Sequence, residues 1–344
     1  MRPAHTALGL AAASLVLLAG TPAHAAGGSY VALGDSYSSG TGTRSYLRDG
    51  TSCQRSVYAY PSLVARSKGY ALNLRACSGA TTRDVTRLQL SALGTGTTYV
   101  SMTVGGNDAG FSDVLTDCAL PAWASNCNRA IDRAQSVIKN QLPARLQTLY
   151  SSIRQRAPRA RVVVAGYPRL FNGEDCNALT WFSPAEQTRL NSTADLLNWR
   201  IASAARAAGF RFTNPTGRYA SHAVCADTEW INGLSHPITE SYHPNRRGHA
   251  AGYAPLVGAG LTGTTVAVNA RTMRQARASA TRLTAQQRRY ALRDRAIKPE
   301  HFLLPDLGSA RSRTAAVRAG VDLSSRASID AADRRFAAAQ SRGH

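Results

Sequence analysis

The amino-acid sequence predicts an α/β fold with a mainly parallel sheet and helices on both of its faces. Three short apolar or β-branched runs, at residues 30–33, 98–104 and 161–165, each stop at a turn that contains glycine, as buried strands do. Two longer segments, 128–156 and 184–208, have the apolar spacing of helices. Strands that alternate with long helical segments form βαβ units, in which the strands are parallel.

The first two strands each lead directly to a polar residue. The strand at 30–33 ends in a Gly-Asp turn that is followed by Ser36, and Asn107 comes soon after the strand at 98–104. In parallel sheets the ligand crevice lies beyond the carboxyl ends of the strands. We therefore expect Ser36 and Asn107 to lie at the same edge of the sheet.

Residues 1–25 have the pattern of an export signal peptide. Arg2 provides a positive start, residues 8–20 form an almost unbroken apolar run, and residues 23–25 form a small-x-small cleavage site. The apolar run is too short to span a bilayer. We therefore expect the mature protein to be secreted and extracellular.

Six cysteines form an even set in a chain that leaves the reducing cytoplasm, which favours a disulfide framework. Six cysteines allow 15 pairings, and pairing neighbours in sequence would close three loops, each worth roughly 2–4 kcal/mol. Metal binding is the competing use, but the closest pair has no C-x-x-C spacing and no histidine nearby. The cysteines are Cys53, Cys77, Cys118, Cys127, Cys176 and Cys225.

The formal net charge of +21 is unevenly distributed. Residues 263–344 contain 16 Lys and Arg against 6 Asp and Glu, and they follow both the last cysteine and the last tryptophan, Trp230. We therefore expect a catalytic domain at 26–262 and, at 263–344, an Ala/Arg-rich basic extension that is helical or disordered, solvated, and dispensable for catalysis. Its charge favours an anionic membrane or cell-wall surface as a partner, and export argues against nucleic acid.

Four short blocks supply the groups that hydrolyse an ester: a nucleophile, oxyanion donors and a base. A lone Gly-Asp-Ser block is weak support for catalysis, because these are ordinary turn residues. The ordered combination is far more specific. The blocks are Gly34-Asp35-Ser36-Tyr37, Cys77-Ser78-Gly79-Ala80, Gly105-Gly106-Asn107-Asp108 and Ser241-Tyr242-His243-Pro244.

These blocks resemble those of the GDSL, or SGNH, hydrolase superfamily, with Ser36, Gly79, Asn107 and His243 at its four name-giving positions. The first block ends in tyrosine here, where the family usually has leucine. The resemblance covers residues 28–262 and is strongest to secreted actinomycete lipases, esterases and phospholipases A1. It implies a three-layer α/β/α sandwich with a five-stranded parallel sheet, and an oxyanion hole made by the Ser36 N–H, the Gly79 N–H and the Asn107 side chain.

The hydroxyl of Ser36 needs a base within about 2.6–3.2 Å, which a neutral imidazole provides near pH 7. We prefer His243, because residues 245–248 lead from it into an apolar segment, 250–257, that suits the closing helix of the domain. The rival histidines are His222, His249 and His236, the last of which also precedes a proline.

Two groups compete to orient the imidazole of His243. The family usually has an aspartate three residues before this histidine, and Glu240 stands there. Some secreted relatives instead use the backbone carbonyl two residues before it, which here belongs to Ser241. Either acceptor can hold the Nδ1 proton, but only a carboxylate adds charge stabilisation. We prefer the Ser241 carbonyl, and expect Asp35 and Asp108 to brace their loops.

We expect no cofactor and no metal site, since the histidines lack H-x-H and H-E-x-x-H spacing. The sequence therefore predicts a secreted serine hydrolase that cleaves lipid or other acyl esters through an acyl-enzyme formed by Ser36 and His243. One alternative is a carbohydrate esterase that removes acetyl or feruloyl groups. The other is a basic secreted protein that binds anionic surfaces and for which hydrolysis is secondary.

Overall fold

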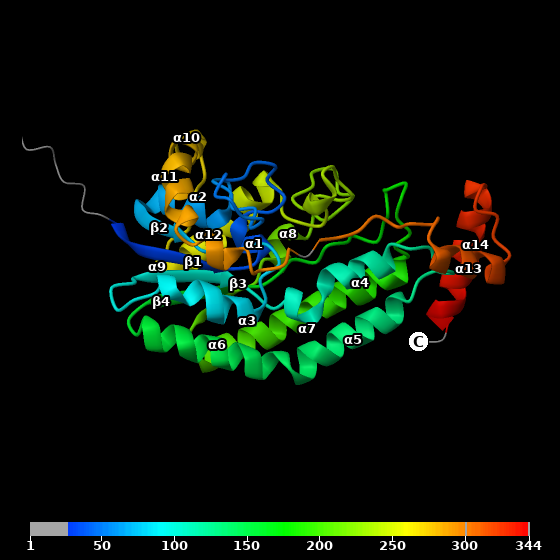
Figure 1. The fold of residues 1–344 in the computed structure, drawn as a ribbon, viewed down its shortest axis with the longest axis horizontal. Helices are drawn as coiled ribbons and strands as arrows, with labels where there is room; N and C mark the ends of the chain where they lie inside the picture. The colour runs from blue at the N-terminus through cyan, green and yellow to red at the C-terminus, as the bar shows by residue number, and fades with distance from the viewer. Residues whose placement is uncertain (1–26, 300, 343–344) are drawn as a thin grey trace, which may run out of the picture.

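The structure, a computed structural model, describes residues 27–299 and 301–342, so the predicted signal peptide lies outside the described residues. A five-stranded sheet in the order β2-β1-β3-β4-β5 forms its centre, and all neighbouring strands are parallel (Figure 1). The strands are β1 (Gly27–Gly34), β2 (Tyr70–Leu74), β3 (Tyr99–Thr103), β4 (Arg161–Ala165) and β5 (Arg211–Thr213).

Helices cover both faces of this sheet. Helices α2 and α9 pack on one face, and α7 with α6 covers the other, where α5 and α4 extend the layer (Figure 1). This arrangement confirms the predicted three-layer α/β/α sandwich. The helices are α1 (Ser36–Ser39), α2 (Tyr60–Lys68), α3 (Thr82–Asp84), α4 (Phe111–Cys118), α5 (Cys127–Asn140), α6 (Leu142–Arg156), α7 (Pro184–Ala207), α8 (Thr216–Tyr219) and α9 (Ala254–Thr262).

The register of the central strands brings their carboxyl ends to the same height. Residues 30–33 of strand β1 are each no more than 2% exposed. This strand pairs with β3 so that Gly34 lies opposite Thr103, and the Asp35 N–H donates to the Thr103 carbonyl at 3.1 Å. The loops that carry Ser36 and Asn107 therefore begin side by side, as expected from the sequence.

Two features differ from the predicted pattern of elements. The helical segment at 128–156 is divided at Gln141 into α5 and α6, because Pro143 lies in the first turn of α6, where a helix does not need its missing N–H. Strands β2 and β5 were not predicted, since β5 is short and β2 carries Asn73 between its apolar residues.

The six cysteines form three disulfides between sequence neighbours: Cys53–Cys77, Cys118–Cys127 and Cys176–Cys225. This confirms the predicted disulfide framework. The first bridge joins the segment after α1 to the segment after β2, two residues before Gly79. It therefore stabilises one side of the candidate oxyanion hole.

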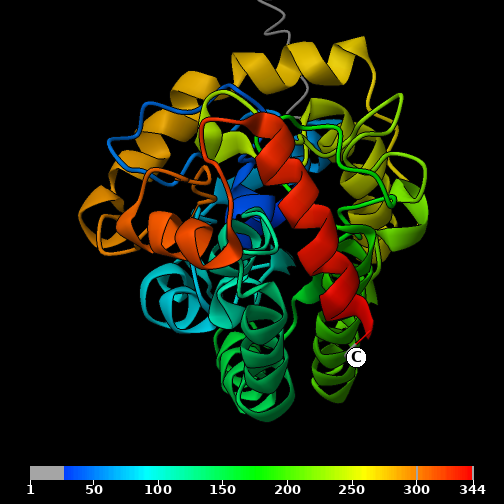
Figure 2. The same ribbon diagram turned by 90° about the vertical axis from the view of Figure 1, so that its right-hand side faces the viewer.

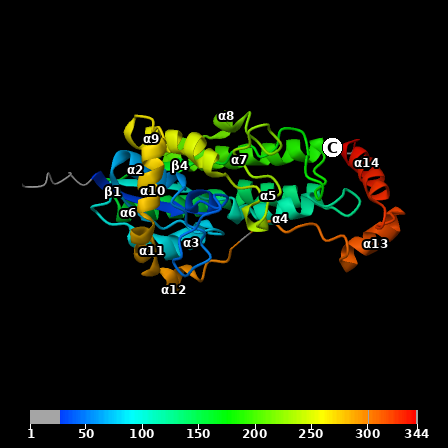
Figure 3. The same cartoon turned by 90° about the horizontal axis from the view of Figure 1, so that it is seen from above.

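The C-terminal extension, predicted to be helical or disordered, forms helices and occupies two places on the molecule. Helices α10 and α11 pack beside α2 and β2, whereas α13 and α14 lie at the opposite end (Figures 1 and 3). The extension helices are α10 (Ala270–Ala278), α11 (Ala280–Arg288), α12 (Ala291–Asp294), α13 (Ala310–Ala319) and α14 (Arg326–Arg342).

The expectation of a solvated extension is wrong for several of its residues. Ala276, Leu283, Ile297 and Phe302 are each no more than 2% exposed and join the main hydrophobic core. Asp294 is fully buried as well. Along the described part of the chain, no helix is both long enough and apolar enough to cross a membrane.

Candidate active site

Ser36 begins α1 at the carboxyl end of β1. The turn before it requires glycine, because Gly34 has a φ of 112° and a Cβ there would lie 2.2 Å from the Thr103 carbonyl oxygen. The buried side chain of Gln89 holds this turn from both sides, accepting from the Gly34 N–H at 2.7 Å and donating to its carbonyl at 2.9 Å. Asp35 caps α1 and accepts a hydrogen bond from the Thr103 hydroxyl at 2.6 Å. These contacts hold the Ser36 backbone rigidly.

The imidazole of His243 lies between Ser36 and Ser241. Its Nε2 is 2.9 Å from Ser36 Oγ, and its Nδ1 is 2.8 Å from the Ser241 carbonyl oxygen. Since a carbonyl can only accept, Nδ1 carries the proton and Nε2 is free to accept the proton of the serine. Burial lowers the pKa of His243 to about 4, although the hydrogen bond to Ser241 opposes this shift. The imidazole is therefore neutral at pH 7, as a general base must be.

Glu240, the other candidate for orienting His243, points elsewhere. Its carboxylate accepts hydrogen bonds from the Tyr46 hydroxyl and, at 3.3 Å, from the Arg44 N–H. No hydrogen bond among the described residues joins it to His243. Of the two candidates, the structure brings only the Ser241 carbonyl to the imidazole.

The three rival histidines make no hydrogen bond to Ser36 among the described residues. His236 is exposed, and His222 stacks on Trp230 with ring centroids 3.8 Å apart. His249 is buried, and its Nδ1 accepts a hydrogen bond from the Tyr60 N–H at 3.3 Å. Within the described chain, only His243 makes a hydrogen bond to the Ser36 hydroxyl.

Hydrogen bonds join the loops that carry the three predicted oxyanion donors, since the Cys77 N–H donates to the Gly34 carbonyl at 3.0 Å. Among the described residues, neither the Ser36 N–H nor the Gly79 N–H donates to a protein acceptor. The Asn107 Nδ2 donates to the Ala80 carbonyl at 3.0 Å, which leaves its second hydrogen for a ligand. Gly79 has a φ of 82°, a conformation that favours glycine. None of the three groups has all of its N–H hydrogens bonded to the described part of the protein.

Asp108 ties the Asn107 loop to the Gly79 loop. Its carboxylate accepts from the Thr82 N–H at 2.8 Å and from the Thr82 hydroxyl at 2.6 Å. Arg145 donates to the same carboxylate at 3.3 Å. Asp108 therefore braces the donor loops, as the sequence predicts, and Asp35 does the same for the serine loop.

A mainly apolar pocket opens from the Ser36 hydroxyl. The empty space in and around it is about 590 Å³, a volume that includes open solvent at its mouth. Its polar lining includes Ser36, Asn107, Ser112 and His243. The apolar lining comes from α4, α7 and three loops, and it includes Phe111, Leu115, Pro168, Leu170, Ala194, Leu197, Tyr242 and Phe302.

The sequence analysis did not identify three of the residues around the site, which are Tyr167, Gln89 and Phe302. Tyr167 donates to the Asp35 carboxylate and also lines the pocket, and its position after the strand at 161–165 was a usable signal. Gln89 and Phe302 reach the site from distant segments that carry no motif. No group of three or more His, Cys, Asp or Glu in the described chain is placed to hold a metal ion.

Known proteins share this combination of sequence and fold. The sequence model of the GDSL-like Lipase/Acylhydrolase family matches residues 32–251. Lipase 1 of Streptomyces coelicolor is 41% identical over 236 residues, which make up 68% of this chain and 87% of that protein.

Two solved structures are also similar. The extracellular lipase from Streptomyces rimosus is 41% identical with a TM-score of 0.64, and the match covers 68% of this chain and 99% of that chain. The phospholipase A1 from Streptomyces albidoflavus NA297 is 40% identical with a TM-score of 0.65, and the match covers 68% and 100% of the two chains.

The matched part contains the serine, glycine, asparagine and histidine described above, and the family match ends before the extension begins. Both solved chains are matched almost completely, whereas about a third of this chain has no counterpart in them. The fold and the extent of these matches lead to one conclusion. The protein belongs to the GDSL-like lipase/acylhydrolase family and is a carboxylic ester hydrolase.

Proposed function

We propose that the protein is a secreted serine hydrolase that cleaves acyl esters of lipids through an acyl-enzyme formed on Ser36. The observation that supports this most directly is the 2.9 Å contact between Ser36 Oγ and a neutral, buried His243 at the head of an apolar pocket. Secretion is proposed from the signal-peptide pattern of residues 1–25, and a similar Streptomyces lipase is described as extracellular.

In the first step, Ser36 Oγ attacks the ester carbonyl carbon while its proton moves to His243 Nε2. The carbonyl oxygen becomes negative and accepts from the N–H groups of Ser36 and Gly79 and from the Asn107 amide. The ester C–O bond then breaks, and His243 gives its proton to the departing alcohol.

In the second step, His243 takes a proton from water, and the resulting hydroxide attacks the acyl-enzyme carbonyl. The bond to Ser36 Oγ breaks, the serine regains a proton from His243, and the carboxylic acid leaves. The Ser241 carbonyl accepts from Nδ1–H throughout and keeps the ring oriented. It adds less charge stabilisation than a carboxylate would.

The substrate class is tested with p-nitrophenyl esters of increasing chain length and by mass spectrometry of products from phosphatidylcholine and triacylglycerol. Because the pocket wall is apolar, we expect medium or long acyl chains to be preferred over acetate, and free fatty acid to appear from the lipids. Activity restricted to acetate esters would instead favour the carbohydrate esterase.

We also propose that the basic extension draws the enzyme to anionic phospholipid surfaces. Arg313 and Arg318 on α13 are exposed, and neither takes part in an ion pair among the described residues. Attraction of this kind is screened over roughly 8–10 Å at physiological ionic strength.

Changing both Arg313 and Arg318 to glutamine is expected to weaken adsorption to vesicles of anionic phospholipid at low salt. The rate on a soluble p-nitrophenyl ester is the control, and we expect it to stay unchanged. Cosedimentation at two salt concentrations measures the effect. If adsorption of the double variant equals that of the wild type, α13 is not the anchor.

A further inference from the structure

The extension lies beyond the family match, yet it reaches the candidate active site. Between α12 and α13 the chain runs along the molecule from the region of the sheet to the far end (Figures 1 and 3). Residues 301–308 of this connection are called the strap below. Its placement depends on contacts at both ends and in the middle.

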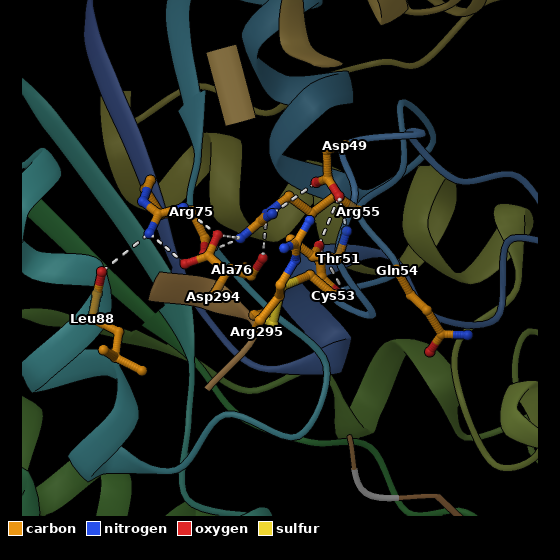
Figure 4. Close-up of a disulfide and its surroundings, with 12 residues drawn as sticks. Asp49, Thr51, Cys53, Gln54, Arg55, Arg75, Ala76, Leu88, Asp294 and Arg295 are labelled. Carbon is orange, nitrogen blue, oxygen red and sulfur yellow. Dashed lines mark hydrogen bonds and ion pairs between the residues drawn. A yellow bond between two sulfur atoms is a disulfide. The ribbon is translucent and has the colours of Figure 1, made fainter. Parts of the chain in front are cut away.

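The first anchor is a buried ion-pair cluster around Asp294. One carboxylate oxygen lies 2.5 Å from a guanidinium nitrogen of Arg55 and 2.8 Å from one of Arg75, and the other oxygen lies 2.7 Å from Arg75 (Figure 4). All three side chains are fully buried. Arg75 also stacks on Tyr290, with its guanidinium carbon 3.8 Å from the ring centroid. These buried ion pairs and the stacking contact anchor the chain before the strap to the part of the protein that the family match covers.

The second anchor is a separate apolar cluster at the far end of the molecule. Trp123 and Trp181 of the catalytic domain are buried there against Ala316 of α13 and Ile329 of α14. The Trp181 Nε1–H also donates to the Asp330 carboxylate at 2.9 Å. Figure 2 shows α14 crossing this end of the molecule. The chain after the strap is therefore anchored as well.

The strap itself contacts α4 and the histidine loop. The Leu303 N–H donates to the Thr116 hydroxyl at 3.0 Å. The ring of Phe302 packs edge-on against Tyr242, with centroids 5.0 Å apart, and Tyr242 directly precedes His243. Phe302 is only 2% exposed and lines the same pocket as Ser36, whereas Leu303 and Leu304 are 55% and 45% exposed. The strap thus turns one large apolar side chain inward.

We propose that Phe302 is a wall of the acyl-binding pocket, and that the extension, by holding it there, limits the length of acyl chain that the enzyme accepts. This inference rests on the proposed function, since it places the acyl chain in the pocket that opens from Ser36. An aromatic ring fixed between two anchors cannot withdraw easily from a growing acyl chain. Phe302 would therefore act as a specificity-determining residue contributed by a segment outside the shared fold.

The test compares Phe302→Ala and Phe302→Trp with the wild type on p-nitrophenyl acetate, butyrate, octanoate and laurate. Removing the ring is expected to raise the laurate-to-butyrate ratio of kcat/KM by about tenfold, since space for a few methylene groups changes selectivity on this scale. The larger indole is expected to lower the same ratio. Leu304→Ala, a change at an exposed position of the same strap, is the matched control and is expected to leave the ratio unchanged.

The ratio within one variant does not depend on how much of the protein is folded, because unfolded enzyme lowers every rate equally. Identical ratios in the wild type and both Phe302 variants would overturn the inference. Hydrolysis of p-nitrophenyl acetate by the wild type tests separately whether Ser36 and His243 are catalytic, because the short acetyl group does not depend on the pocket wall. If the wild type hydrolyses none of the four esters, it is the proposed function that fails.

Discussion

Replacing Ser36 with alanine is expected to lower kcat on a soluble p-nitrophenyl ester by roughly 10⁴- to 10⁶-fold, the scale for loss of a serine nucleophile. The variant lacks the hydroxyl that lies 2.9 Å from His243 Nε2, so no acyl-enzyme forms, although the pocket remains. Initial rates and labelling by an organophosphonate measure the effect together. The wild type is expected to carry the label on Ser36 and the variant to carry none. Substantial hydrolysis by the variant would remove Ser36 from the mechanism.

Glu240→Gln and Ser112→Ala serve as comparisons for the Ser36 variant. The glutamine keeps the size of Glu240 and deletes its charge, and because the Ser241 carbonyl holds His243, we expect kcat to fall by less than about tenfold. A loss near 10⁴-fold would show that the carboxylate orients the imidazole. Ser112 lines the same pocket without a hydrogen bond to His243 among the described contacts, so its alanine variant is expected to keep most of the activity.

Replacing Asp294 with alanine is expected to lower the free energy of unfolding by about 3–5 kcal/mol, the cost of removing one partner from a buried ion pair. Arg55 would keep its ion pair with Asp49 at 2.7 Å, but Arg75 would lose its only carboxylate partner in the described chain. Unfolding in urea with the disulfides intact measures the difference. A change below about 1 kcal/mol would show that this buried cluster contributes no more to stability than an exposed ion pair does.

The exposed pair between Arg169 and Asp195 is the matched control. Its nitrogen and oxygen atoms are 2.6 Å apart, close to the distances at Asp294, but both side chains are exposed. Asp195→Ala is therefore expected to change the unfolding free energy by only about 0–1 kcal/mol. The contrast between the two variants isolates the effect of burial.

The Asp294 effect is expected to depend on pH. Burial by itself would raise the pKa of Asp294, but the hydrogen bonds and charges of Arg75 and Arg55 lower it below its ordinary value of 3.8. A lowered pKa in the folded state stabilises the protein above the ordinary value, and this contribution is lost as pH falls through the folded-state pKa. The stability difference between the wild type and Asp294→Ala should therefore be full at pH 7 and shrink below about pH 4.

Much of the fold was predictable because its signals are local. The runs at 30–33, 98–104 and 161–165 became β1, β3 and β4, and the helix predicted at 184–208 became α7. Strands β2 and β5 were missed because they pair along the outer parts of the sheet, where neighbouring strands and not apolar runs determine strand formation.

The candidate site was also predictable in its chemistry, because the reacting groups and the turns that present them are adjacent in sequence. The Gly-Asp-Ser turn after a strand is weak support by itself, and Ser36 was identified because three further blocks follow it in a fixed order. The choice between Ser241 and Glu240 was different. Both precede His243 closely, and only the tertiary structure turned the glutamate toward Tyr46 and left the Ser241 carbonyl at the imidazole.

By itself, the sequence determined the fold class and the family to which the four blocks belong, and it left the extension either helical or disordered. Only the tertiary structure decided that Asp294 lies between two buried arginines and that Phe302 lines the pocket. Counting the charges along the arginine-rich extension predicts a solvated segment, because the count does not show which groups face each charge in the folded protein. Whether a charge is buried depends on the partner that faces it, and Arg55 and Arg75 lie more than two hundred residues before Asp294.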